Sequence, residues 1–205
     1  MNPILHATSY NGHQLMTSPR YEPAFHTTIL QIIEALLNDM IARHSQVFVM
    51  MLVLKFPAYS HDVNDDYQGG NALLSRFMEA FTLHLKRAGY DPKYLWVREE
   101  SSYDQVHYHL MILVNGNEVQ NAYGMLGKAQ ELWGNCLGVD GPGYVHHCRK
   151  GDYVNEYGGM KLRRNSPEFQ QDYANCFHWA SYLAKCSGKE NTPIHANRFG
   201  GSRVG

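Results

Sequence analysis

Two histidines on one predicted strand are the first residues in this chain that could do chemistry. The run Val106–Val114, VHYHLMILV, alternates so that His107 and His109 share one face of a strand with Met111 and Leu113. Two imidazoles side by side on one face can bind the same divalent cation. The opposite face is almost wholly apolar, which predicts that it packs against helices.

An acidic pair precedes these histidines on the neighbouring predicted strand, Tyr94–Glu100. The short polar stretch between the two strands, SSYDQ, predicts an antiparallel hairpin. If the hairpin is centred on Tyr103, Glu99 lies opposite His107, whereas a register shifted by one residue would select Glu100. We expect Glu99 to complete a site of two nitrogen ligands and one oxygen ligand, with open positions for water and substrate.

A tyrosine and a lysine one helical turn apart form the second candidate group. Apolar residues recur at helical spacing from about Pro167 to Ser187, and Tyr182 falls nearly opposite the centre of that apolar stripe. Tyr182 and Lys185 are neighbours on such a helix, so the ammonium can lie beside the phenol. Tyr90 and Lys93 repeat the spacing, but a proline separates them and no helix fixes their geometry.

The hydrophobic pattern predicts the helices and strands that carry these residues. Besides the hairpin and the last helix, it predicts helices over about 22–43, 73–85 and 118–137, a central strand over 47–56 and one short strand within 143–148. Hairpin-linked strands indicate an α+β fold, with helices packed on an antiparallel sheet of four or five strands. We expect residues 1–20 to form a loose arm and residues 21–205 to form a single domain. The tail RFGGSR is expected to have no regular secondary structure.

Composition excludes several classes of protein. Hydrophobic residues make up 44% of the 205 residues, which excludes a disordered chain. The formal net charge is −1, but residues 149–205 carry 9 basic and 5 acidic side chains, a net of +4. The four cysteines form no CxxC pair, and no apolar run is long enough to cross a bilayer. We expect a soluble protein of the cytoplasm without a signal peptide.

The order of the motifs resembles that of a known superfamily. A strand with His-x-His followed by a helical Tyr-x-x-Lys resembles the HUH endonucleases, which include rolling-circle replication initiators, conjugative relaxases and single-strand transposases. The segments WVREE, HYHLMILVNG, SYLAK and RFGGSR are more closely similar to the phage replication proteins of inovirus type, the YagK/YfjJ-domain group. The resemblance extends from about Arg20 to Arg203.

This resemblance implies an HUH/RRM-like fold and a site. Tyr182 would be the nucleophile, Lys185 would assist it, and Mg²⁺ or Mn²⁺ would be held by three ligands: Glu99, His107 and His109. The enzyme would nick single-stranded DNA, form a covalent 5′-phosphotyrosine and initiate rolling-circle replication of a phage or mobile element. Host replication proteins in the bacterial cell would be further partners.

This chain departs from the group's pattern at one point. Many relatives carry two tyrosines one helical turn apart, whereas this chain has His178 and Cys186 one turn before and after Tyr182. By this resemblance, the protein would be an enzyme with a single catalytic tyrosine.

Four basic residues are candidates for contact with DNA: Arg98, Lys161, Arg163 and Arg164. Phosphate contacts by the last three would suit the basic C-terminal quarter, although a solvated loop explains them equally well. Three alternative functions stay open. They are a transposase or relaxase that uses the same site, a DNA-binding regulator with a degenerate site, and an α+β domain with surface histidines.

Overall fold

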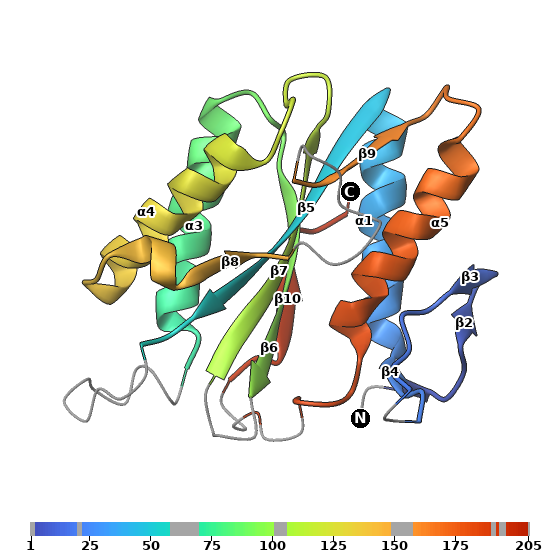
Figure 1. The fold of residues 1–205 in the computed structure, drawn as a ribbon, viewed down its shortest axis with the longest axis horizontal. Coiled ribbons are helices and arrows are strands. Elements are labelled where there is room, and N and C mark those ends of the chain that lie inside the picture. Colours follow the sequence, from blue (N-terminus) through green and yellow to red (C-terminus); the bar gives the residue numbers. More distant parts are fainter. Residues whose placement is uncertain are drawn as a thin grey trace.

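The structure, a computed structural model, describes residues 3–19, 22–57, 70–100, 106–148, 158–189, 192 and 196–204. The predicted hairpin turn around Tyr103 lies outside these residues. Within them, helices cover both faces of one antiparallel sheet, so the molecule has three layers (Figure 1). The predicted α+β class is confirmed.

The sheet has the strand order β10–β6–β7–β5–β8, and β9 pairs with β5 beyond the end of β8. All of these pairs are antiparallel. The strands are β5 (Gln46–Lys55), β6 (Lys93–Glu100), β7 (Val106–Asn115), β8 (Val145–His147), β9 (Met160–Arg163) and β10 (Phe199–Gly201). The sequence pattern did not predict β9 and β10. Each is too short to show a hydrophobic pattern, and each forms a strand only through its pairing with β5 or β6.

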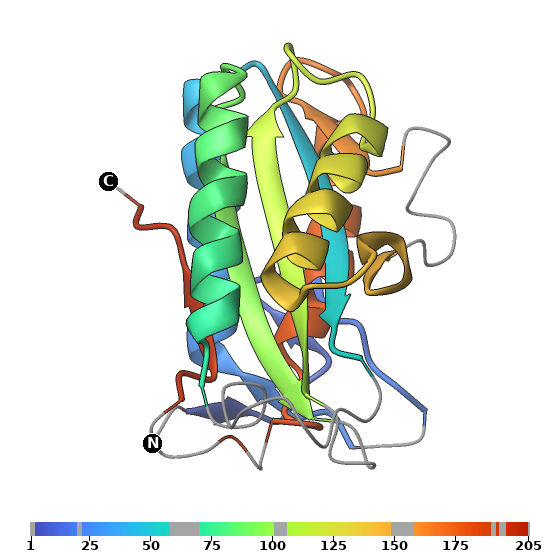
Figure 2. The ribbon, with the colours of Figure 1, turned by 90° about the vertical axis from the view of Figure 1, so that its left-hand side faces the viewer.

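Four longer helices complete the layers: α1 (Thr27–Arg43), α3 (Ala72–Arg87), α4 (Tyr123–Leu137) and α5 (Phe169–Ala180). In Figure 1, α3 and α4 lie on one side of the sheet, and α1 and α5 lie on the other. Figure 2 looks onto the side of α3 and α4. No helix in the described ranges is both long and apolar enough to span a membrane.

The central strand β5 explains why the sheet needs two helical layers. Val47, Val49 and Met51 belong to the core beneath α1 and α5, whereas Phe48 and Met50 belong to the core beneath α3 and α4. All five side chains are almost completely buried. A strand that is covered on both faces has a continuous apolar run rather than alternation, as the sequence predicts here.

Residues 1–20 differ from the loose arm that the sequence predicts. Their described part forms short strands: β1 (Ile4–Leu5), which pairs with β4 (Phe25–His26), and β2 (Ser9–Tyr10), which pairs with β3 (His13–Gln14). The His13 ring lies 5.2 Å from the ring of Tyr173 and 4.9 Å from that of Phe177, both on α5. Leu15 is buried as well. These contacts have no periodic spacing, so the sequence pattern did not reveal them.

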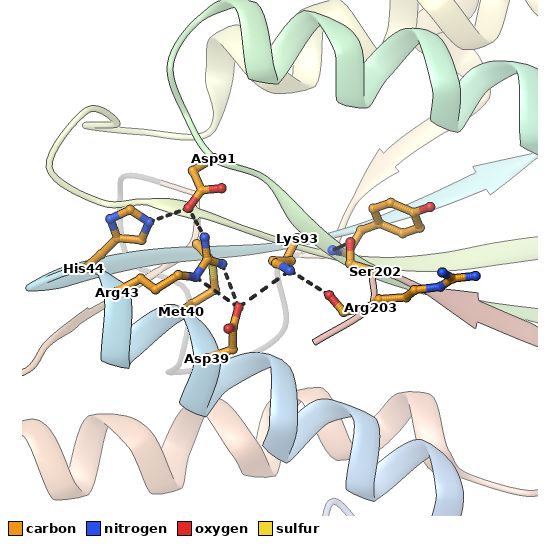
Figure 3. Close-up of polar contacts among 9 residues, drawn as sticks. Asp39, Met40, Arg43, His44, Asp91, Lys93, Ser202 and Arg203 are labelled. Atoms are coloured by element: carbon orange, nitrogen blue, oxygen red, sulfur yellow. Dashed lines mark hydrogen bonds and ion pairs between the residues drawn. The ribbon is translucent and has the colours of Figure 1, made fainter. Parts of the chain in front are cut away.

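The C-terminal tail also differs from its prediction, since it forms an edge strand against β6. Lys93 Nζ donates to the backbone carbonyl of Arg203 (2.7 Å), and the backbone N–H of Tyr94 donates to Ser202 Oγ (3.0 Å) (Figure 3). Lys93 Nζ also lies 3.7 Å from Asp39 Oδ2 on α1. The start of β6 therefore ties the tail to the helical layer.

A glycine in β10 permits this pairing, and its substitution tests it. A Cβ atom at Gly200 would lie 2.7 Å from Trp96 Cζ2, inside van der Waals contact. We expect Gly200→Ala to lower the free energy of unfolding by about 1–3 kcal/mol through overpacking. Denaturant unfolding measures the change.

A glycine in α4 is the matched control. A Cβ atom at Gly127 meets nothing within 4 Å, so Gly127→Ala should raise the free energy of unfolding by up to about 1 kcal/mol. A Gly200→Ala protein as stable as the wild type would contradict the packing of β10 on Trp96.

Candidate active site

The pairing of β6 with β7 decides which acidic side chain meets the histidines. Glu99 pairs with His107 and Val97 pairs with His109, so the predicted register is confirmed. Glu100 pairs with Val106, whose side chain belongs to the core beneath α3 and α4. Paired residues share one face of a sheet, so Glu100 points away from the histidines. Glu99 is therefore the acidic neighbour of both imidazoles.

The three side chains converge closely. His109 Nε2 lies 3.2 Å from Glu99 Oε2, and His107 Nε2 lies 3.6 Å from the same oxygen. One ligand atom from each residue lies within 4.8 Å of the other two. In the described part of the chain, no other three His, Cys, Asp or Glu side chains come together in this way. Glu99 and His109 are buried, and His107 is half-buried.

This donor set fits a divalent cation. Ligands at about 2.1 Å from an octahedral ion, set at right angles, are about 3.0 Å apart. The observed separations of 3.2 and 3.6 Å are close to that value. Among the described residues, neither ring nitrogen of the buried His109 makes a well-aligned hydrogen bond, and the close polar contact of Nε2 is its 3.2 Å approach to Glu99 Oε2. A buried nitrogen without a well-aligned hydrogen bond is costly, and a cation at this position would satisfy one of them.

Electrostatics keep the carboxylate in its metal-binding form. Burial alone would raise the pKa of Glu99, because it disfavours the charged form. The polar contacts of His107 and His109, together with the charge of Lys189, outweigh burial and hold the pKa of Glu99 well below its usual range. The carboxyl group is therefore ionised at neutral pH.

Lys189 is a residue of this site that sequence reasoning missed. It is only 1% exposed, and its Nζ donates to Glu99 Oε1 over 2.6 Å. It also donates to the backbone carbonyl of Lys185. Glu99 and Lys189 are 90 residues apart, and no local spacing links them. No sequence signal could have identified the pair.

The candidate nucleophile lies at the end of α5 rather than inside a helix that continues to Ser187. The α-helix ends at Ala180, and Tyr182 lies on the 3₁₀ turn η3 (Ser181–Ala184). Ser181 Oγ donates to the carbonyl of His178 (2.7 Å) and accepts the backbone N–H of Met16 (2.8 Å). Serine back-bonding of this kind competes with helical hydrogen bonds, which explains the early end of α5.

Tyr182 nevertheless lies beside the three side chains suited to hold a cation. Its ring centroid is 5.2 Å from that of His109, and Lys185 Nζ lies 4.3 Å from the Tyr182 ring centroid. Burial, the charge of Glu99 and the nearby Cys148 thiol raise the pKa of Tyr182 to about 12. The phenol therefore stays protonated at neutral pH with Lys185 in place, and a further positive charge beside its oxygen would be needed to favour the phenolate.

A cavity opens beside the candidate nucleophile. Its volume is about 350 Å³, and its walls include His109 and Tyr182 together with Met51, Val53 and Trp179. Its lining is mostly apolar. Such a cavity suits the flat face of a nucleobase better than a bare phosphate.

Arg98 does not join this site. It pairs with Tyr108 on the face beneath α3 and α4, and it is 1% exposed. Its guanidinium donates to Tyr108 Oη (3.2 Å) and to the carbonyl of Gly70 (3.3 Å). Because it is buried on the opposite face from Glu99, Arg98 cannot contact DNA at the site.

The other three predicted DNA contacts also lie away from the site. Lys161 and Arg163 belong to β9, which pairs with residues 46–49 of β5, whereas His109 pairs with Val53. At about 3.3 Å per residue, roughly 15–25 Å of strand separates the two places. Figure 1 shows β9 at the far end of β5 from β8. Arg164 Nη1 instead donates to the carbonyl of Ile41 at the end of α1 (3.1 Å).

The competing Tyr90–Lys93 pair lies near the C-terminal end of β7, whereas His107 and His109 lie near its N-terminal end. The backbone carbonyl of Tyr90 accepts a hydrogen bond from the N–H of Asn115 (2.8 Å), the last residue of β7. His107 is the second residue of that strand, about 26 Å away at the rise of an extended chain. Among the two matches to Tyr-x-x-Lys, only Tyr182 therefore lies beside the histidines.

Comparisons with known proteins give one firm result. A search of curated proteins found no match. Among solved structures, the catalytic domain of the Adeno Associated Virus type 5 Rep protein is similar, with a TM-score of 0.35 and 11% identity over 58% of this chain and 75% of that chain. Because the TM-score and the identity are this low, we infer nothing about the site from that structure. The family match, by contrast, spans residues 5–202, and this chain belongs to the YagK/YfjJ C-terminal domain family.

Proposed function

We propose that this protein is a metal-dependent endonuclease that nicks single-stranded DNA through a covalent phosphotyrosine. The observation that carries the proposal is the packing of the Tyr182 ring on His109, one of three side chains suited to hold a cation. Tyrosine, cation ligands and an adjacent cavity thus meet at one place. The resemblance of the motifs to HUH endonucleases supports the same reaction.

In this reaction the phenol oxygen of Tyr182 attacks the scissile phosphorus. A new O–P bond forms to the 5′ phosphate, the bond to the 3′ oxygen breaks, and a free 3′-hydroxyl is released. The phenol proton passes to water, and the departing 3′ oxygen takes up a proton. The phosphotyrosine conserves the energy of the phosphodiester, so the strand can be resealed while the 3′-hydroxyl primes synthesis.

The other side chains of the site supply charge. Glu99, His107 and His109 would hold Mg²⁺ or Mn²⁺, which when bound offsets the negative charge that develops on the phosphate oxygens. Lys185 lies over the Tyr182 ring and favours the phenolate by its charge. Since Lys185 forms no bond to the substrate, its loss should slow the reaction without abolishing it.

The biological role that fits this chemistry is initiation of rolling-circle replication of a phage or mobile element. Single-stranded DNA would be the substrate, and replication proteins of the bacterial host would be partners. A single nucleophile can make one covalent link at a time. A transposase or relaxase could use the same site.

Removal of the metal ligands gives the first test. Because a ligand that binds only the native state stabilises it, Mn²⁺ should raise the melting temperature of the wild type. The His107→Ala/His109→Ala protein should show neither this rise nor measurable heat of Mn²⁺ binding. His84→Ala, which removes an exposed histidine on α3, on the other side of the sheet (Figure 1), is the control. Equal Mn²⁺ affinity in the wild type and the first variant would refute the site.

Substitution of the nucleophile gives the second test. Tyr182→Phe should abolish the protein–DNA adduct, because no oxygen remains to attack, while Mn²⁺ binding is unchanged. Loss of this hydroxyl should change the free energy of unfolding by about 0.5 kcal/mol or less. Denaturing electrophoresis detects the adduct, and peptide mass spectrometry locates the modified residue. The control is Tyr123→Phe, at an exposed position on α4. A DNA adduct on a residue other than Tyr182 would contradict the assignment.

Filling the cavity gives the third test. Val53 is half-buried and lines the cavity beside His109, so Val53→Phe places a larger ring in the space proposed for a base. We expect adduct formation to fall at least about tenfold, since a misplaced substrate loses the geometry of attack. Mn²⁺ affinity should remain. Leu83→Phe, at an exposed position on α3, is the control. Wild-type adduct formation by Val53→Phe would show that the substrate does not enter this cavity.

A further inference from the structure

A buried ion pair lies directly behind the metal-binding group. The side chain of Lys189 has no exposed surface, and its ammonium lies 2.6 Å from Glu99 Oε1. The other carboxylate oxygen, Oε2, faces both histidines. The two oxygens of Glu99 therefore have different neighbours, a lysine on one side and two imidazoles on the other. Only Oε2 is available to a cation beside His107 and His109.

The backbone explains how Lys189 reaches this place. Gly188 has a φ of +80°, a conformation that glycine adopts without strain, and its carbonyl accepts a hydrogen bond from the N–H of Glu100 (2.7 Å). The chain after η3 is thereby attached to the end of β6, next to Glu99. The ammonium of Lys189 then also donates to the backbone carbonyl of Lys185. One ammonium thus joins the carboxylate to the segment that carries Tyr182 and Lys185.

The positive charge of Lys189 also changes how strongly Glu99 can attract a cation. With Lys189 in place, the ammonium and the Glu99 carboxylate have a net charge of zero, and the two histidines are neutral when they bind a metal. A cation on this group is therefore held by less negative charge than a free carboxylate would provide. Since charges in a buried site interact strongly, Lys189 weakens the binding of the cation and leaves more of the cation's charge for the phosphate.

We propose that Lys189 is a positioning residue that restricts Glu99 to a one-oxygen ligand and cancels its charge, so that the site holds its cation weakly and in register with Tyr182. The inference rests on the proposed function, because it assigns Lys189 a task at that metal site. It requires no contact between Lys189 and DNA.

The inference predicts opposite effects on metal binding and on the reaction. In Lys189→Met the carboxylate regains its full charge and both oxygens, so Mn²⁺ should bind at least about tenfold more tightly. Nicking at saturating Mn²⁺ should nevertheless be at least about tenfold slower, since the cation is less electron-withdrawing and the ligand is no longer joined to the Tyr182 turn. Lys189→Arg keeps the charge and should lie closer to the wild type in both measurements.

The experiment titrates Mn²⁺ into the DNA-free protein by calorimetry and separately measures nicking of a labelled single strand at saturating Mn²⁺. Lys128→Met, which removes a partly exposed lysine paired with Glu131 on α4, controls for loss of a positive charge elsewhere. Thermal unfolding checks that each variant folds. If Lys189→Met does not fold, Lys189→Gln is measured in its place, because its amide can still donate to Glu99.

Each result decides the inference. Tighter Mn²⁺ binding with slower nicking supports it. Affinity and rate that fall together would show that Lys189 only holds the fold, and values equal to the wild type would show that it has no role; either result overturns the inference and leaves the proposed function standing. A wild-type protein that binds no Mn²⁺ would remove the proposed function, and the inference with it.

Discussion

The antiparallel pairing of β6 with β7 is the constraint on which the rest of this structure depends. Side chains alternate between the two faces of a sheet, so a slip of one residue would carry Glu99 into the core beneath α3 and α4 and place Arg98 or Glu100 beside the histidines. The register is held by buried apolar side chains on one face of β6 and by a half-buried tryptophan on the other. Leu95 and Val97 pack towards α1 and α5, and Trp96 packs towards α3 and α4.

A polar site on a sheet that is covered on both faces must satisfy its own charges. Glu99, His109 and Lys189 are all buried, and an isolated buried charge would be strongly destabilising. The carboxylate is instead shared between the ammonium and the two imidazoles, and among the described residues the His109 nitrogens make no well-aligned hydrogen bond that a cation would have to replace. The arrangement therefore combines a paired charge with a place for a metal ion. The cavity beside Tyr182 is the route by which the proposed substrate would approach without opening the core.

Distant parts of the chain support this arrangement. The N-terminal hairpin packs on α5, and the Met16 N–H binds Ser181 where that helix ends. At the other end of the chain, the Arg98 N–H donates to the carbonyl of Arg198 just before β10, so the tail extends the sheet beside β6. The positions of the candidate nucleophile and of the candidate metal ligands thus depend on contacts among the described N-terminal, central and C-terminal segments of the chain.

Local sequence patterns were sufficient for those parts of the site that depend on neighbouring residues. Alternation placed His107 and His109 on one face and limited the acidic partner to Glu99 or Glu100, because strand period is a local property; the pairing of β6 with β7 then decided for Glu99. The remaining features of the site follow from long-range packing. It buried Arg98, placed Lys161 and Arg163 at the far end of β5, ended α5 before Tyr182, and brought Lys189 to Glu99. Each of these outcomes depends on contacts between segments distant in the chain, which no local pattern of residues encodes.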